Sequence, residues 1–145
     1  MTTFGENRKA RFDYEILETL SAGLELVGSE VKSIRAGKIS LAGSFVGVRG
    51  KEAFLIGADI PPYQPKNTSP DYDSTRSRKL LVTKSELEKL ATAEGTKGLT
   101  IVPLSVYNKG RFIKLDLAIA KGKKKFDKRE SIKKRDVERD LKRTL

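Results

Sequence analysis

The side chains that could do chemistry in this sequence are carboxylates, Lys, Arg, Tyr and hydroxyls, because its 145 residues include no His and no Cys. Without them the chain forms neither an imidazole base nor a thiolate nucleophile, and it offers no Cys ligand to zinc or an iron–sulfur cluster. A Ser-His-Asp or Cys-His active site is therefore excluded. We expect a protein that is not an enzyme and uses no cofactor or metal.

Two carboxylates close together in sequence, Asp71 and Asp73, are the candidates for a metal site. Oxygen ligands of this kind suit Mg²⁺. Nothing nearby in the sequence completes a ligand set, and acidic residues in a polar segment are usually solvated turn residues. A magnesium-dependent nuclease is therefore kept as a minor alternative.

Basic residues are the stronger signal, since 30 Lys and Arg against 19 Asp and Glu give a net charge of +11. Residues 1–120 carry +4 of this charge and residues 121–145 carry +7. Such clusters attract phosphates whatever the base sequence, and four on one chain favour a nucleic-acid partner over merely solvated faces. The clusters are Arg8, Lys9 and Arg11 beside Asn7; Lys32, Arg35 and Lys38; Arg76, Arg78 and Lys79; and Lys121, Lys123, Lys124 and Lys125.

Three aromatic residues in polar or basic surroundings, Tyr63, Tyr72 and Phe126, narrow the choice of nucleic acid. An exposed ring beside cations is suited to stacking on an unpaired base. Structured RNA offers such bases, whereas duplex DNA hides them. For Tyr63, packing against the neighbouring prolines is an equally good interpretation.

Alternating apolar residues predict the strands that must position these side chains. The alternation is clear at 113–119 and at 100–106, and the Asn-Lys-Gly turn at 108–110 joins the two into a hairpin. Pro103 cannot donate to a neighbouring strand, so it predicts a sheet edge or a bulge. Further strands are expected at 44–48 and 52–58, at 14–20 and 24–27 as an opening hairpin, and at 79–82.

Two helices are predicted between the strands. Thr83 and Glu86 match a capping box that starts a helix ending near Gly95. Residues 29–36 form the other, with Glu30 expected on its outer surface beside Lys32 and Arg35. A long polar loop spans 60–77. The fold class is mainly β: a small antiparallel oligonucleotide-binding-type barrel of about six strands with two or three short helices.

The last 25 residues form a separate unit by composition. We expect residues 1–120 to be an RNA-binding β-barrel domain and residues 121–145 a basic tail, disordered alone because it holds too few apolar residues to offset its chain entropy. Apolar residues four positions apart near its end indicate a helix formed on a partner. No apolar run approaches a membrane span, and no secretory signal is present, so a cytoplasmic protein with no membrane partner, monomeric when free, is expected.

Several motifs in a fixed order resemble one family over nearly the whole chain, the SsrA-binding protein family or small protein B, the partner of transfer-messenger RNA in bacterial trans-translation. The motifs are Asn7-Arg8-Lys9-Ala10-Arg11, residues 30–38 (EVKSIRAGK), 76–81 (RSRKLL), 120–124 (AKGKK), 127–130 (DKRE) and 132–135 (IKKR). The sequence departs from the family pattern at Phe12, Ser21, Tyr72 and Ser74.

The resemblance implies an adaptor that delivers transfer-messenger RNA to stalled ribosomes for ribosome rescue and tagging of incomplete proteins. The barrel would grip the transfer-RNA-like domain of that RNA, with Asn7, Lys114 and the basic run at 121–124 at contact positions. The tail would occupy the decoding centre of the small ribosomal subunit and contact its RNA through Phe126, Asp127, Lys128 and Arg129. The alternative is a general single-stranded RNA-binding protein or a ribosome-associated structural protein.

Overall fold

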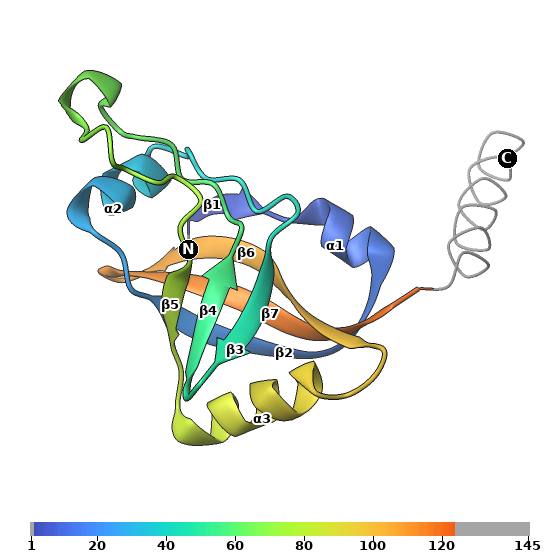
Figure 1. The fold of residues 1–145 in the computed structure, drawn as a ribbon. Helices are drawn as coiled ribbons and strands as arrows, with labels where there is room; N and C mark the ends of the chain where they lie inside the picture. The colour runs from blue at the N-terminus through green and yellow to red at the C-terminus, as the bar shows by residue number, and fades with distance from the viewer. Residues whose placement is uncertain (1, 124–145) are drawn as a thin grey trace, which may run out of the picture.

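The computed structural model describes residues 2–123, which form one antiparallel sheet with three α-helices at its margins (Figure 1). The strands are β1 (Thr3–Glu6), β2 (Tyr14–Leu24), β3 (Phe45–Arg49), β4 (Glu52–Ile56), β5 (Arg78–Leu81), β6 (Leu99–Lys109) and β7 (Phe112–Gly122). The helices are α1 (Arg8–Asp13), α2 (Gly28–Arg35) and α3 (Lys84–Glu94), with a short 3-10 turn, η1 (Pro65–Asn67), in the long loop. Within this range no helix combines the length and apolar character that crossing a membrane requires.

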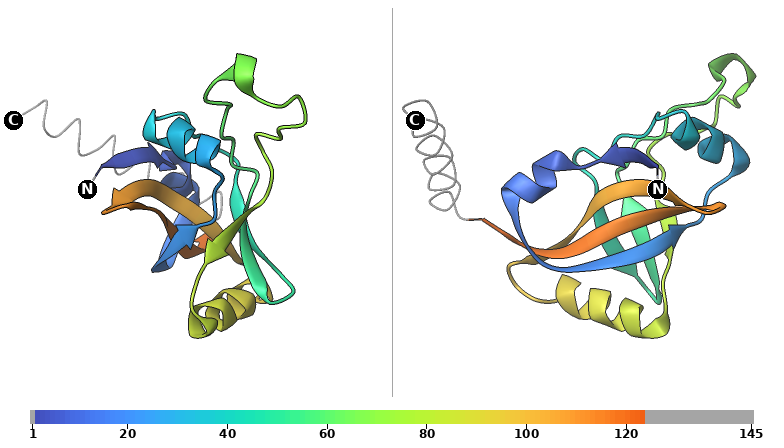
Figure 2. Two further views of the ribbon diagram at one scale, coloured as in Figure 1. Left: turned by 90° about the vertical axis from the view of Figure 1, so that its left-hand side faces the viewer. Right: turned by 180° about the vertical axis from the view of Figure 1, so that it is seen from behind.

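The sheet curls into a small barrel. Its strand order is β1-β6-β7-β2-β5-β4-β3, and every neighbouring pair is antiparallel. β3, which ends this strand order, packs against β6 near the other end of the order, and α3 contacts both strands (Figure 2). The predicted fold class, a mainly β antiparallel barrel with short helices, is confirmed.

The core follows from the alternation of β7. Leu115 and Leu117 are fully buried inside the barrel, as the period-two pattern predicts. On the opposite face of the same strand, Ala118 and Ala120 pack in a second, smaller cluster with Ala10 of α1. Both faces of β7 are therefore covered near its end, and α1 acts as the cover.

The hairpin of β6 and β7 forms as predicted. Pro103 lies at an irregularity of the pairing, because the register shifts between Pro103 and Ser105. The bulge interpretation is therefore correct. The alternative of a sheet edge is wrong, since β6 pairs with β1 on one side and β7 on the other.

The predicted opening hairpin at 14–20 and 24–27 is wrong, because β2 continues without a turn to Leu24. Ala22 is fully buried opposite Leu115, and Gly23 pairs with Lys114. Partners on both sides satisfy the backbone of this stretch, which outweighs the turn tendency of an Ala-Gly pair. At the other end of the sheet, β7 runs to Gly122, two residues past the predicted domain boundary at residue 120.

Local signals locate α3 correctly, whereas β1 and α1 were not predicted. The Thr83 hydroxyl accepts the Glu86 N–H at 3.2 Å, and the Glu86 carboxylate accepts the Thr83 N–H at 2.8 Å. The capping box therefore forms in both directions, and the helix ends at Gly95 as expected. By contrast, α1 has six residues and no apolar period long enough to detect.

Candidate nucleic-acid interface

The first turn of α2 contains a buried carboxylate. Glu30 was expected on the outer surface, but its side chain is fully buried and its Oε1 accepts the Val27 N–H at 3.0 Å. The expectation is wrong because two arginines from beyond the long loop reach this carboxylate. The three residues Glu30, Arg76 and Arg78 are called the buried ion cluster below.

Arg78 is the central cation of the buried ion cluster and is itself fully buried. Its Nε and Nη2 both donate to Glu30 Oε2, at 2.9 and 2.7 Å, and its Nη1 donates to the Ala58 carbonyl at 2.8 Å. Every arm of the guanidinium is thus engaged inside the protein. The expectation that Arg78 contacts RNA is corrected: it joins α2 to β5 and to the segment that follows β4.

Arg76 occupies the rim of the same cluster. It donates to the remaining oxygen of Glu30, and about a third of its side chain is exposed. One carboxylate therefore carries two guanidinium groups, and the cluster keeps a net positive charge at the surface. Of the predicted pair, Arg76 can still face a phosphate.

The ionisation of Glu30 depends on these donors. Burial alone would raise its pKa, but the Val27 N–H and the guanidiniums of Arg78 and Arg76 together lower the pKa below its ordinary 4.5. Glu30 is therefore charged at neutral pH. Burial and the nearby Glu30 raise the pKa of Tyr72, whose hydroxyl donates to the Ile60 carbonyl at 2.6 Å. This hydrogen bond anchors the long loop at Ile60.

The exposed side of α2 presents the second predicted cluster. Lys32, Arg35 and Lys38 all reach the surface. Arg35 donates to the Arg111 carbonyl at 3.2 Å, which links α2 to the turn between β6 and β7. The structure therefore brings the cluster of α2 and the rim of the buried ion cluster to one side of the barrel, two groups that lie about forty residues apart in sequence.

The first and fourth predicted clusters also meet, at what we call the α1 edge: Arg8, Lys9, Arg11, Lys121 and Lys123. Gly122 pairs with Tyr14, and the Lys123 N–H donates to the Asp13 carbonyl at 3.1 Å, so the end of β7 lies beside the end of α1. Arg8 also forms an exposed ion pair with Glu6. Lys124 and the predicted ribosome contacts Phe126, Asp127, Lys128 and Arg129 lie outside the described residues.

Asn7, predicted to contact RNA, has a structural task in the free protein. Its Oδ1 accepts the Ala10 N–H at 3.3 Å and caps α1, while its Nδ2 donates to the Pro103 carbonyl at 3.0 Å. The side chain is 8% exposed. It therefore positions Arg8 and Lys9, which follow it on the exposed surface.

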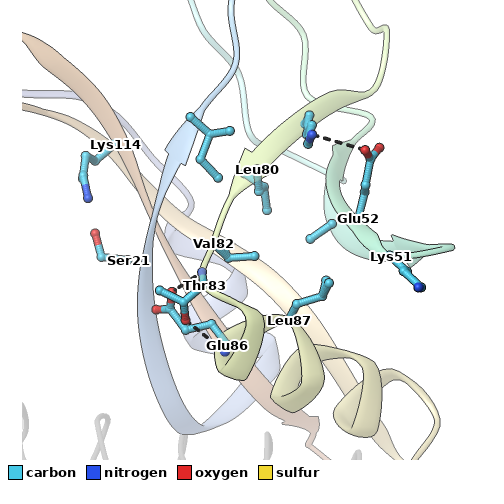
Figure 3. Close-up of a pocket in the computed structure, with 12 residues that line it drawn as sticks. Ser21, Lys51, Glu52, Leu80, Val82, Thr83, Glu86, Leu87 and Lys114 are labelled. Atoms are coloured by element: carbon cyan, nitrogen blue, oxygen red, sulfur yellow. Dashed lines mark hydrogen bonds and ion pairs between the residues drawn. The ribbon is translucent and has the colours of Figure 1, made fainter.

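A hollow of about 680 Å³ lies where β2, β5 and β7 meet the start of α3, and we call it the polar hollow. Figure 3 shows Ser21 and Lys114 on one side of the opening and Lys51 with Leu87 on the other. Lys79 is paired with Glu52 at 3.2 Å. Within residues 2–123, neither Lys51 nor Lys114 forms a side-chain hydrogen bond or ion pair, so both can bind an anion. The polar residues that line the hollow are Ser21, Lys51, Glu52, Lys79, Thr83, Glu86 and Lys114.

The family resemblance points to Lys114 and the third basic cluster includes Lys79, but the sequence does not show that these residues share a hollow with Ser21, Lys51 and Thr83. In sequence, Thr83 is recognised only as a helix cap and Ser21 only as a departure from the family pattern. Ser21 is placed by a 2.6 Å hydrogen bond between its hydroxyl and that of Tyr107. They come together because β2 pairs with both β7 and β5. No pattern of neighbouring residues in the sequence predicts that β2 pairs with both strands.

The carboxylates considered for a metal site lie in a turn. Asp73 Oδ1 accepts the N–H and the hydroxyl of Thr75, each at 3.0 Å. In residues 2–123 no group of three or more potential metal-ligating acidic side chains is found. The arrangement as a whole therefore offers lysine ammoniums, guanidiniums and hydroxyls on open surfaces, which is the chemistry of phosphate recognition.

A family model described as SmpB protein matches residues 4–145 of the chain. The chain belongs to the SmpB protein family. An SsrA-binding protein of Chloroflexus aggregans is 51% identical over 140 residues, covering 97% of this chain and 89% of that protein. One from Gloeobacter violaceus is 49% identical, covering 97% of this chain and 91% of its own length. The resemblance read from the motifs is confirmed.

The SmpB family also provides a structural comparison. A solved chain described by the words "tmRNA-SmpB: a journey to the center of the bacterial ribosome" superposes with a TM-score of 0.70 and 45% sequence identity. The match covers 88% of this chain and 93% of that one. The barrel and its helices are thus a fold shared within the SmpB family.

Proposed function

We propose that this protein binds the transfer-RNA-like domain of transfer-messenger RNA and delivers it to stalled ribosomes, where incomplete proteins are tagged and the ribosomes are released. The relatives at about 50% identity are named for binding SsrA, and the comparable solved chain is named with tmRNA and the bacterial ribosome. The role is one of binding and placement, without catalysis, by a cytoplasmic protein that is monomeric when free.

The observation that carries the proposal is the pairing of basic clusters into two exposed regions, the α1 edge and the outer side of α2. Lys114 in the polar hollow adds a cation that no described carboxylate neutralises. Cations distributed over a rigid barrel suit a ligand whose phosphates keep a fixed arrangement, since each contact then forms without ordering a flexible chain. A folded RNA such as a transfer-RNA-like domain meets that requirement.

Comparative binding tests the proposal directly. The full chain is titrated with a transcript of the transfer-RNA-like domain and with an unstructured RNA of equal length, at the same salt concentration. We expect at least a tenfold preference for the folded domain. Equal affinities at every salt concentration would instead indicate a general single-stranded RNA-binding protein.

Residues 125–145 are proposed to act on the ribosome, as the family resemblance implies. Truncation after Lys124 should leave binding to the isolated transfer-RNA-like domain within about twofold, because the barrel surfaces are intact, and should abolish tagging on stalled ribosomes. Phe126→Ala in the full chain should reduce tagging in the same assay. Full tagging activity of the truncated protein would contradict the proposed role of this segment.

A further inference from the structure

The long loop, residues 60–77, projects from the barrel beside α2 (Figures 1 and 2). Four of the five prolines of the chain lie in this loop, and residues 60–77 include no glycine. Each proline ring fixes one backbone angle, so the loop has little conformational freedom to lose when a partner binds. The prolines are Pro61, Pro62, Pro65 and Pro70. The composition of the loop therefore favours a pre-organised binding element.

Hydrogen bonds fix the long loop where it joins the barrel. The Ile60 N–H donates to the Ser74 carbonyl at 2.9 Å, and the Tyr72 hydroxyl donates to the Ile60 carbonyl at 2.6 Å, so the two arms of the loop are joined. From α2, the Ser33 hydroxyl donates to the Pro61 carbonyl at 2.6 Å. The barrel and α2 thus set the position of everything that the loop carries.

The outer part of the long loop has turns of its own and one exposed ring. The Asn67 N–H and the Thr68 hydroxyl donate to the Gln64 carbonyl at 3.0 and 2.7 Å. Next to these turns, Tyr63 is 39% exposed, and its hydroxyl forms no hydrogen bond within residues 2–123. Tyrosine is enriched in protein interfaces, where an exposed ring on a rigid support acts as an anchor.

The charge of the outer part, residues 61–75, differs from that of the rest of the protein. These residues include one cation, Lys66, and two carboxylates, Asp71 and Asp73, a net charge of −1 on a chain of +11. Both aspartates are exposed. Phosphates are repelled by such a segment, whereas a positively charged protein surface is complementary to it. The loop is therefore suited to a protein partner better than to RNA.

We propose that residues 61–75 dock on a basic protein of the ribosome, with the Tyr63 ring in an apolar pocket of that protein and Asp71 beside its lysines or arginines. The solved chain comparable to this one is named with the bacterial ribosome, so the inference rests on the proposed function and adds a protein contact to it. Stacking of Tyr63 on a nucleobase would instead bring phosphates to a segment in which carboxylates outnumber cations.

Photo-crosslinking separates the two classes of partner. The full chain, with p-benzoylphenylalanine in place of Tyr63, is bound with transfer-messenger RNA to stalled ribosomes and irradiated. We expect an adduct with a basic protein that ribonuclease does not shorten and that mass spectrometry identifies. The control carries the same group in place of Phe112, which is 71% exposed on β7 near Lys114 and should give an RNA adduct that ribonuclease shortens.

Charge reversal gives a second readout whose sign differs between the two partners. Asp71→Lys and the control Glu88→Lys on α3 make the same charge change at exposed sites, and within residues 2–123 neither original carboxylate forms a hydrogen bond or ion pair. Asp71→Lys should bind stalled ribosomes about fivefold more weakly than Glu88→Lys, because a like charge then faces the basic partner. The two variants should bind the isolated transfer-RNA-like transcript equally.

The other outcomes distinguish this inference from the proposed function. An RNA adduct at Tyr63, an adduct with an acidic protein, or no adduct at Tyr63 while Phe112 gives its own would overturn the loop proposal and leave the proposed function standing. Tighter ribosome binding by Asp71→Lys than by Glu88→Lys would also overturn it, since that sign indicates phosphates near the loop. If the unsubstituted protein did not bind stalled ribosomes, the proposed function and this inference would both be wrong.

Discussion

The buried ion cluster and the α1 edge use the same kinds of residue for opposite purposes. In the buried ion cluster, Arg78 is fully enclosed and all three of its guanidinium nitrogens donate to protein oxygens. At the α1 edge, Lys9 and Lys121 are exposed, and within residues 2–123 neither side chain forms a hydrogen bond or ion pair. What separates the two regions is Glu30, the carboxylate that draws two arginines inward.

The comparison shows that a basic motif does not by itself indicate RNA binding, because acidic residues elsewhere in the fold can bury and neutralise its cations. The Arg-Ser-Arg stretch at 76–78 and the basic stretch at 8–11 look alike in sequence. The first stabilises the barrel by joining α2 and β5 to the segment that follows β4, whereas the second stays available to phosphates. Substitutions in the first should therefore change folding stability, and substitutions in the second should change RNA affinity.

The largest expected effect is on stability. Arg78→Ala removes the bidentate partner of a fully buried carboxylate, so we expect the free energy of unfolding to fall by about 3–5 kcal/mol. Urea denaturation measures this change. Arg8→Ala is the control, because its ion pair with Glu6 is solvent-exposed and should contribute about 0–1 kcal/mol. A similar small decrease for both variants would contradict the structural role of Arg78.

The pH dependence of stability should reveal Glu30 itself. Since its pKa in the folded protein lies below 4.5, ionised Glu30 stabilises the fold at any pH above its unfolded-state pKa. This contribution is lost as the pH falls from about 4.5 through the lowered folded-state pKa. Glu30→Gln should be less stable at pH 7, and its deficit relative to the wild type should shrink below pH 4. A constant deficit from pH 7 to pH 3, in unfolding curves measured at each pH, would contradict this assignment.

Substitutions at the α1 edge should change RNA affinity and leave folding stability nearly unchanged. Combined Lys9→Ala and Lys121→Ala substitutions should weaken binding of the transfer-RNA-like transcript several-fold. They should also reduce the slope of log K against log salt by roughly 0.7–0.9 for each phosphate that the protein no longer neutralises. The melting temperature should stay within a degree or two. Lys84→Ala, which removes an exposed cation outside both regions, is the matched control and should leave the slope unchanged.

Much of the fold could be predicted because its signals are local. The Thr83–Glu86 capping box and the alternation along β7 each lie within a few residues, and both describe the structure correctly. The continuous strand β2 could not be predicted, because the partners of Gly23 come from β5 and β7. The buried position of Glu30 likewise depends on Arg78, which lies 48 residues away.

The residues of the candidate site also divide into those that local sequence signals identify and those that only the fold brings together. Clusters of cations are visible in sequence, so Lys32, Arg35 and Lys121 were identified before the fold was known, whereas Lys114 was identified only through the family resemblance. The lining of the polar hollow and the exposed ring of Phe112 were not, because no local pattern separates Phe112 from an ordinary strand residue. Which face of β7 is left uncovered is decided by α1, which covers only one end of it.

Strand β7 also sets a length scale. Lys114 and Lys121 are seven residues apart on an extended strand, a span of about 23 Å. β2 and β6 pair with it on both sides across this stretch, so the span cannot stretch or fold. Because seven is an odd number, the two side chains leave opposite faces of the strand. The strand therefore holds two cations at a fixed distance on opposite faces, so an RNA that contacts both must wrap around the sheet and cannot lie along one face of it.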